Sequence, residues 1–270
     1  MRMLLRRSLL MALCLALVAT FSVAAPGGQA AAKSKKMKMP TKMTYYRLDD
    51  GKWVKEDTET YKYNKKGDLI KITDSDSEAI LTTTIKYKYK KKKKVSCTSK
   101  MDNSFRTTYK FNKKGQLVSA RDHYLDANTL TTYAYSYNKG GYLTAVRWTY
   151  NDNEGIRRSG VFNYTTSFAP GGKVTIAASG KDYENKDGSY SWTLNKKGLL
   201  TKVPGDGCIS TFTYLWKGKY VKQRIETVTY EDGSISKYRV DYEYGKRKAS
   251  ASRYYKYINK DPRTLIGGFW

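Results

Sequence analysis

Residues 61–69 read Tyr61-Lys62-Tyr63-Asn64-Lys65-Lys66-Gly67-Asp68-Leu69, and the stretch recurs at Tyr109–Leu117, Tyr135–Leu143 and Trp192–Leu200. Tyr and Lys alternate before the Asn, which places the rings on one face of a β-strand and the charges on the other. Asn favours the first position of a type I turn, and Gly supplies the left-handed residue of a hairpin that closes with a bulge. Each copy therefore predicts the end of one strand, a tight turn and the start of the next strand.

Two kinds of turn alternate along the chain. The basic or uncharged turns are Asn64–Gly67, Lys90–Lys94, Asn112–Gly115, Asn138–Gly141, Pro170–Lys173, Asn195–Gly198, Lys217–Lys219 and Gly245–Lys248. The mostly acidic turns between them are Asp49–Gly51, Asp74–Glu78, Asp102–Asn103, Asp126–Asn128, Asn151–Gly155, Asp182–Gly188, Asp206 and Glu231–Gly233. Successive turns of an antiparallel meander lie at opposite ends of the sheet. The sequence therefore predicts one Lys-rich rim and one acid-rich rim, joined by about 16–17 strands.

The strand faces predict the fold class. Tyr133, Tyr135 and Tyr137 share one face, with Ala134 and Ser136 on the other. A long sheet with one aromatic face has to curl or fold into two layers to remove that face from water. Short turns and the absence of a long crossover favour curling. We expect an all-β fold, a long antiparallel meander of repeated β-hairpins curled into a barrel, half-barrel or shell, with helix only in the signal segment.

The first 32 residues are typical of a signal peptide. Three arginines within the first seven residues precede an apolar run, Leu9–Ala25, and small residues offer cleavage after Ala24 or Ala32. An uncleaved anchor helix and lipid modification at Cys14 are the alternatives. We expect a protein that is secreted or associated with the cell envelope.

Three further segments follow from composition. Residues 33–44 are expected to be a basic disordered linker, residues 45–257 the β-hairpin repeat domain, and residues 258–270 a tail. Because the tail ends on Phe269 and Trp270, we expect it to dock over an open edge or mouth of the sheet. Cys97 and Cys208 are interpreted as independent thiols, which pair only if the sheet rolls back on itself.

The charge predicts the class of partner. The formal net charge is +27, and removal of residues 1–32 takes away three arginines and no acid, which leaves +24. Lysine outnumbers arginine, which favours diffuse attraction to a repeating anion over bidentate recognition. The candidate polyanion-binding residues are Lys65, Lys66, Lys90, Lys91, Lys92, Lys93, Lys94, Lys113, Lys114, Lys139, Lys196, Lys197, Lys217 and Lys219. For the densest run, Lys90–Lys94, the alternative is that the lysines only prevent an exposed hairpin from pairing with other chains.

The repeat resembles the YD or RHS-type repeats of large secreted bacterial proteins, whose core is Tyr-x-Tyr-Asp-x-x-Gly-Arg-Leu. The copies at Tyr61–Leu69, Tyr109–Leu117 and Tyr135–Leu143 match best, although Asn replaces the Asp and no Arg precedes the Leu. The unit Asp50-Gly51-Lys52-Trp53 is similar to MORN-like repeats as well. These resemblances imply a rolled β-sheet that encloses, binds or displays something, and they imply no catalytic residue.

Candidate catalytic and metal-binding residues are few. His123, the only histidine, lies beside Asp122, and no sequence signal identifies a nucleophile for them. The turn Asp74–Glu78 resembles a calcium-binding cluster but lacks the glycine and spacing of an EF-hand. We therefore expect no enzyme activity, no metal and no cofactor.

Three hypotheses about function follow. The first is a secreted non-enzymatic protein that binds an anionic cell-wall polymer or acidic glycan through its Lys-rich rim. The second is self-assembly, or binding of a protein partner, through the opposite basic and acidic rims. The third is an enzyme that uses a cleft in the curled sheet. Nucleic acid is disfavoured because Tyr and Lys face opposite ways, so bases find no stacking platform flanked by charge.

Overall fold

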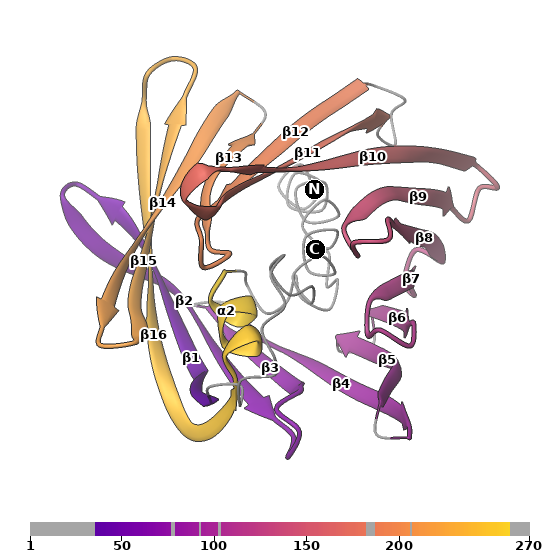
Figure 1. Cartoon of the computed structure of the whole chain (residues 1–270), viewed down its shortest axis with the longest axis horizontal. Coiled ribbons are helices and arrows are strands. Elements are labelled where there is room, and N and C mark those ends of the chain that lie inside the picture. The colour runs from indigo at the N-terminus through magenta and orange to yellow at the C-terminus, as the bar shows by residue number, and fades with distance from the viewer. Residues whose placement is uncertain are drawn as a thin grey trace.

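The protein is a closed antiparallel barrel of 16 strands in the computed structural model (Figure 1). Each strand pairs with the next one in sequence, and β16 pairs with β1 to close the ring. The structure describes residues 36–259 except 77–78, 92, 102–103, 182–186 and 206, and except the side chains of residues 252, 256 and 259. The predicted signal peptide and residues 260–270 lie outside this part. The expected all-β meander is confirmed, and its curl is complete.

The strands are β1 (Lys36–Asp49), β2 (Lys52–Tyr63), β3 (Leu69–Ser75), β4 (Ile80–Lys90), β5 (Lys93–Met101), β6 (Phe105–Phe111), β7 (Leu117–Tyr124), β8 (Thr129–Tyr137), β9 (Leu143–Asn151), β10 (Arg157–Ala169), β11 (Lys173–Lys181), β12 (Asp187–Leu194), β13 (Leu200–Gly205), β14 (Cys208–Lys217), β15 (Tyr220–Tyr230) and β16 (Ile235–Ser250). A 3-10 turn, η1 (Pro170–Gly172), joins β10 to β11, and the helix α2 (Ala251–Asn259) follows β16.

The repeated Asn-x-x-Gly turn has the geometry that its sequence predicts. At Asn112 the backbone N–H donates to the carbonyl of Gln116, and the side-chain Oδ1 accepts from the N–H groups of Lys114 and Gln116. Gly115 adopts φ 82°, in the left-handed region. The turns that begin at Asn64, Asn138 and Asn195 repeat the backbone hydrogen bonds. A register shift in each adjoining strand pair marks the bulge.

Substitution of Gly115 by Ala tests the turn geometry. A Cβ at this position would meet no atom within 4 Å, so the cost is the left-handed backbone alone. We expect the free energy of unfolding to fall by about 1–2 kcal/mol. Urea unfolding measures this change, and Gly115→Asn should lose less because Asn tolerates the left-handed region better than Ala. Equal losses for the two variants would contradict the assigned turn.

The aromatic face of the sheet points into the barrel. α2 lies within the ring of strands (Figure 1), and its Tyr257 packs edge-on against Tyr63 of β2 with ring centroids 5.5 Å apart. Tyr242 of β16 donates a hydrogen bond to the carbonyl of Ile258. Because side chains alternate along a strand, the lysines between the inward tyrosines point outward.

Tyrosine hydroxyls tie neighbouring strands together along this inner face. Five of them donate to a backbone carbonyl of the preceding strand at 2.6–2.8 Å, namely Tyr63 to Pro40, Tyr87 to Leu69, Tyr137 to Leu117, Tyr214 to Leu200 and Tyr244 to Val221. Burial raises the pKa of each of these phenols, so they remain protonated donors. The many tyrosines of the chain therefore stabilise the barrel by linking its neighbouring strands.

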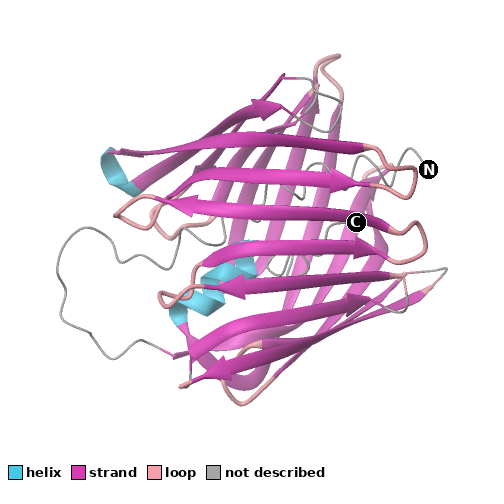
Figure 2. Ribbon diagram, turned by 90° about the vertical axis from the view of Figure 1, so that its right-hand side faces the viewer, coloured by secondary structure: helices cyan, strands magenta, loops and turns pink. Residues whose placement is uncertain are grey.

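The two ends of the barrel carry different turns, as expected. Turns after even-numbered strands lie at one end, which we call the basic end, and turns after odd-numbered strands lie at the other, the acid-rich end. Figure 2 shows both helical segments at the basic end, where η1 follows β10 and α2 follows β16. The segregation is incomplete, because Asp68 lies at the basic end and Arg157 and Arg158 lie at the acid-rich end.

Two predictions about the chain termini of the domain are wrong. β1 begins at Lys36, so residues 36–44 belong to the barrel and not to a linker. Met37, Met39 and Met43 are buried on its inner face, a period of two that the intervening lysines obscured in the sequence. A helix also follows the last strand, although none was expected after residue 32. Its buried side chains Tyr254 and Ile258 are one helical turn apart.

The predicted turn at Gly245–Lys248 does not form. β16 continues through these residues to Ser250, so the barrel has 16 strands and no seventeenth strand follows. A Cβ at Gly245 would lie 2.5 Å from Thr41 Cγ2, so the glycine serves close approach between β16 and β1. Cys97 and Cys208, the two cysteines of the described barrel, form no disulfide, in agreement with the interpretation from their spacing.

Candidate polyanion-binding site

The structure gathers the predicted lysines at the basic end. They lie in, or next to, the turns that follow β2, β4, β6, β8, β12 and β14. Lys65, Lys113, Lys114, Lys139 and Lys196 are all exposed at the tips of the Asn turns. Lys92 lies outside the described residues. The alternation of turns therefore brings together residues that are up to 154 positions apart, from Lys65 to Lys219.

Two of these lysines place their ammonium groups within 4 Å of the centroid of an aromatic ring. Lys66 Nζ lies 3.3 Å from the ring centroid of Tyr89, and Lys197 Nζ lies 3.8 Å from that of Trp216. Both rings come two residues after a tyrosine that bonds the preceding strand, so the arrangement occurs twice around the barrel. Cation–π attraction holds these two ammonium groups at the mouth of the aromatic interior.

One buried carboxylate at this end, that of Asp68, forms ion pairs with two basic side chains. Asp68 is 3% exposed; its Oδ1 lies 2.8 Å from Lys94 Nζ and 3.6 Å from Arg253 Nη2, and its Oδ2 accepts a hydrogen bond from Tyr89. Burial alone would raise the pKa of Asp68, but the charge and hydrogen bond of Lys94, with Tyr89 and Arg253, lower it below its ordinary value. Lys94 is thus engaged inside the protein and less available to an external anion than its neighbours.

Asp68→Asn should destabilise the barrel in a pH-dependent way. The variant leaves Lys94 and Arg253 without their carboxylate, and we expect a loss of about 1–3 kcal/mol at pH 7. Because the folded-state pKa is lowered, the ionised carboxylate stabilises the fold above the ordinary pKa near 4, and this contribution disappears as the pH falls through the folded value. Urea midpoints of the two proteins should therefore converge below about pH 3. A constant gap down to that pH would contradict the ion pair.

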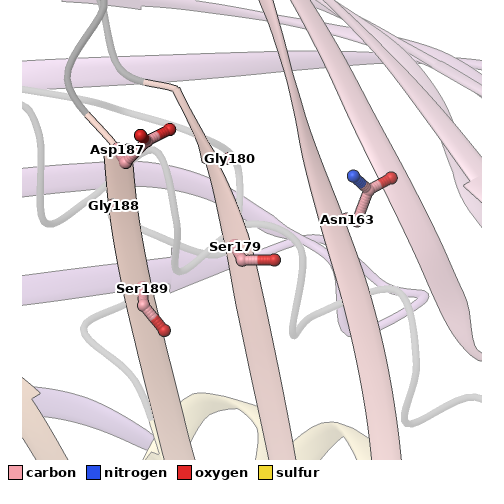
Figure 3. Close-up of a pocket in the computed structure, with 6 residues that line it drawn as sticks. All are labelled: Asn163, Ser179, Gly180, Asp187, Gly188 and Ser189. Carbon is pink, nitrogen blue, oxygen red and sulfur yellow. The ribbon is translucent and has the colours of Figure 1, made fainter.

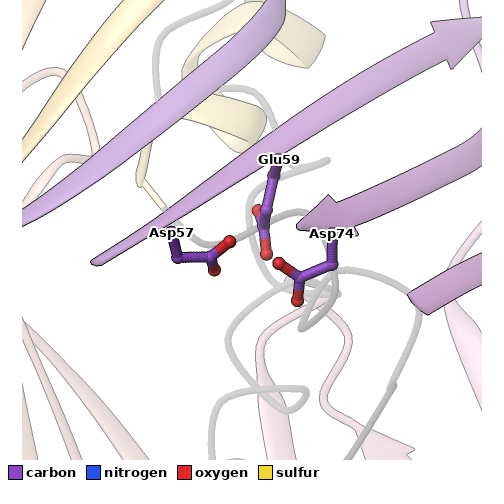
Figure 4. Close-up of side chains that lie close together, drawn as sticks. All are labelled: Asp57, Glu59 and Asp74. Atoms are coloured by element: carbon purple, nitrogen blue, oxygen red, sulfur yellow. The ribbon is translucent and has the colours of Figure 1, made fainter. Parts of the chain in front are cut away.

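The inner face also holds a group of carboxylates that sequence analysis did not bring together. Asp57, Glu59 and Asp74 approach one another so that one oxygen of each lies within 4.8 Å of the others (Figure 4). Glu59 and Asp74 are register partners on β2 and β3. Glu59 accepts hydrogen bonds from Tyr45 and Tyr61, which gives it a role in the wall. Period-two alternation with Tyr61 could have placed Asp57 and Glu59 inside, but the pairing with Asp74 depends on register.

The two described carboxylates of the turn that was compared with a calcium-binding cluster, Asp74 and Asp76, lie in different surroundings. Asp74 belongs to β3 and faces the barrel interior, whereas Asp76 is exposed in the turn, where its Oδ1 accepts the N–H of Ala79. Ser77 and Glu78 lie outside the described part.

The structure separates the two residues considered for acid–base chemistry. Asp122 is 2% exposed on the inner face of β7, and His123 follows it on the outer face, in register with Arg106. Asp122 therefore cannot orient the His123 ring.

A shallow hollow lies on the outer wall over β10, β11 and β12. Its lining residues are Asn163, Ser179, Gly180, Asp187, Gly188 and Ser189 (Figure 3). Asn163, Ser179 and Ser189 lie side by side through the register of the three strands. None of the predicted lysines takes part, so this hollow is separate from the basic end. Among the described residues, no helix has the length and hydrophobicity that a membrane crossing requires.

Comparisons with known proteins bear on the fold. No protein-family model matches the chain, and no curated protein matches it in sequence. The crystal structure of a porin-like protein from Bacteroides uniformis superposes with a TM-score of 0.52 at 16% identity, over 76% of this chain and 96% of that one. A porin-like protein from Bacteroides vulgatus matches at 10% identity with a TM-score of 0.36, over 78% of this chain and all of that one. The chain thus shares the β-barrel fold of the Bacteroides uniformis protein.

Proposed function

We propose that this protein is a secreted, envelope-associated and non-enzymatic β-barrel that binds an anionic cell-wall polymer or acidic glycan through its basic end. The observation that carries the proposal is the collection of lysines from six separate turns at one end of the barrel. A flexible polyanion can contact several of these turns at once, and such multivalent attraction does not need a deep pocket.

The chemistry of the outer wall supports a location in water. Lys86, Lys88 and Lys90 alternate with the inward tyrosines of β4 and are all exposed. The lipid-facing band of an outer-membrane barrel is apolar, and lysine at its midplane costs about 2–4 kcal/mol. We therefore assign this protein to the envelope by attraction to its polymers, and the barrel is expected to lie outside the hydrocarbon layer.

Binding to a defined polymer tests the proposal. We expect the purified protein to bind immobilised poly(glycerol phosphate) and not neutral dextran, with an affinity that falls steeply between 50 and 500 mM NaCl. Replacing Lys65, Lys113, Lys114, Lys139 and Lys196 by Gln should weaken binding about tenfold or more, and Arg at the same positions should preserve it. Salt-insensitive binding, or Gln and Arg variants of equal affinity, would overturn the proposal.

A second candidate function, self-association through the two ends, has one observation in its favour. Apolar side chains are exposed beside the turns of the acid-rich end, namely Ile80, Leu125, Ile156, Ile209 and Ile235. Contact between this end and the basic end of another molecule would cover them and pair opposite charges. Light scattering at low salt should then detect species larger than a monomer, and Ile80→Ser with Ile235→Ser should reduce them. Monomers at millimolar concentration would rule this function out.

A further inference from the structure

The outer wall formed by β2–β9 is strongly basic in the strands themselves, in addition to the lysines of the turns. Residues in register on antiparallel neighbours share a face of the sheet. One such row runs from Lys62 through Lys71, Thr84, Lys100 and Arg106 to His123, across six adjacent strands. A second row contains Lys88 and Lys110, joined through Ser96. The cations are therefore neighbours in space although they are distant in sequence.

The carboxylates of the same strands do not share this face. Glu59, Asp74 and Asp122 point into the barrel, as does Asp57 through its register with the inward Tyr45. Glu56, at the bulge of β2, forms an ion pair with Arg47. Across the described part of β2–β9 the sheet thus separates acid inside from base outside. Apart from the exposed Glu56, an external anion approaching the described part of this wall meets no opposing carboxylate.

The residues between the cations are small and polar. Thr60, Thr84, Thr98 and Thr108 occupy outward positions beside the lysines. Neighbouring strands lie about 4.8 Å apart and successive outward residues about 6.7 Å apart, so the charges repeat at short intervals in both directions. Hydroxyl and ammonium groups at this spacing suit a chain of repeated anionic groups.

Curvature favours a flexible chain over a flat surface. β2–β9 are eight of the 16 strands and cover about half of the circumference. A planar membrane touches only a strip of such a convex wall, whereas a linear polymer can follow it. The wall is continuous with the basic end, because Lys88 and Lys90 lead directly into the turn after β4.

We propose that the outer wall of β2–β9 is an extended binding surface along which a linear polyanion lies after contacting the basic end. This inference rests on the proposed function and adds a second, larger surface to it. The other half of the barrel is different, since Asp241 and Glu243 lie outward on β16 beside Arg239 and Lys42.

Two variants with the same change in charge test the proposal. The wall variant replaces Lys62, Lys71, Lys86, Lys88, Arg106 and Lys110 by Gln. The control variant replaces six exposed basic residues of the other half, Arg157, Arg158, Lys181, Lys202, Lys222 and Lys237, by Gln. On poly(glycerol phosphate) at 100 mM NaCl we expect the wall variant to bind at least tenfold more weakly and the control less than threefold more weakly. Equal losses would show that net charge alone acts, and would overturn the proposal.

A measurement on the unmodified protein guards against misfolding of the variants. Lysine acetylation followed by mass spectrometry should show that the polymer protects Lys62, Lys86 and Lys110 but not Lys181, Lys202 or Lys222. Equal protection of both groups of lysines would contradict the proposal that the polymer lies along the outer wall of β2–β9. Monomeric glycerol phosphate should protect none of these lysines. If the protein binds anionic vesicles in preference to the polymer, the partner of this surface is a membrane and the proposed polymer is wrong. If the unmodified protein fails to bind the polymer at any salt concentration, the proposed function itself fails, and this outcome is distinct from failure of the wall.

Discussion

Tyr254→Ala is expected to lower the free energy of unfolding by about 3–5 kcal/mol, among the largest effects of any single substitution. Tyr254 lies on α2 with no exposed surface. The centroid of its ring lies 5.8 Å from that of Tyr220 and 5.9 Å from that of Tyr244. Its hydroxyl oxygen accepts a hydrogen bond from the Val221 N–H at 2.7 Å. Truncation would leave a cavity and a buried donor without its partner.

Tyr254→Phe and Tyr255→Ala are the controls for this prediction. The Phe variant keeps the ring and loses only the hydrogen bond, so we expect a smaller loss of about 1–2 kcal/mol. Tyr255 is only half-buried on the same helix, and its removal should cost less than that of Tyr254. Urea unfolding gives all three values. A neutral Tyr254→Ala would show that α2 does not pack inside the barrel.

Asp122→Asn is expected to stabilise the barrel at alkaline pH. Asp122 is fully buried among inward residues of β6–β8, and its Oδ1 has no hydrogen-bond partner among the described residues. Burial raises the pKa of Asp122 to about 8, an effect that the neighbouring Thr107 opposes only in part. The unfolded chain releases this proton near pH 4, whereas the folded chain retains it until about pH 8. The carboxyl group therefore reduces stability progressively as the pH rises from about 4 to 8.

The Asn side chain removes this titration. We expect a gain of about 5 kcal/mol at pH 8 and little gain at pH 4, because the pKa differs by about four units between the folded and unfolded chain and each unit corresponds to about 1.4 kcal/mol. Urea midpoints from pH 4 to 9 measure the difference, with the exposed turn residue Asp126→Asn as the control. An unchanged pH slope in Asp122→Asn would contradict the burial of an uncompensated carboxyl group.

Local chemistry made the strands and turns predictable. Asn and Gly at fixed offsets determine hydrogen bonds within five residues, and Tyr–Lys alternation determines the face of a strand. From these signals the meander, the aromatic inner face and the segregation of lysines followed. The same local signal misled at Gly245, where glycine serves close packing against Thr41 and does not form a turn.

Long-range pairing was not predictable in the same way. Closure depends on β1 meeting β16 across the whole chain, and the lysines of β1 hid the buried alternation of Met37 and Met39. The approach of Glu59 to Asp74, and the row from Lys62 to Arg106, depend on register between strands. α2 was missed because tyrosines at helical spacing resemble the Tyr–Lys alternation of the strands that precede it.

Closure of the ring between β1 and β16 decides which residues are inside, and a disulfide across this seam tests it most directly. Lys42 and Glu243 are register partners whose exposed side chains form an ion pair at 2.8 Å. Cα atoms of antiparallel partners lie about 4.5–5.5 Å apart, within disulfide range. In a protein with its natural cysteines replaced, Lys42→Cys with Glu243→Cys should oxidise to a monomer of altered mobility on a non-reducing gel, and Lys42→Cys with Lys88→Cys should not. Free thiols, or cross-links only between molecules, would contradict the closed barrel.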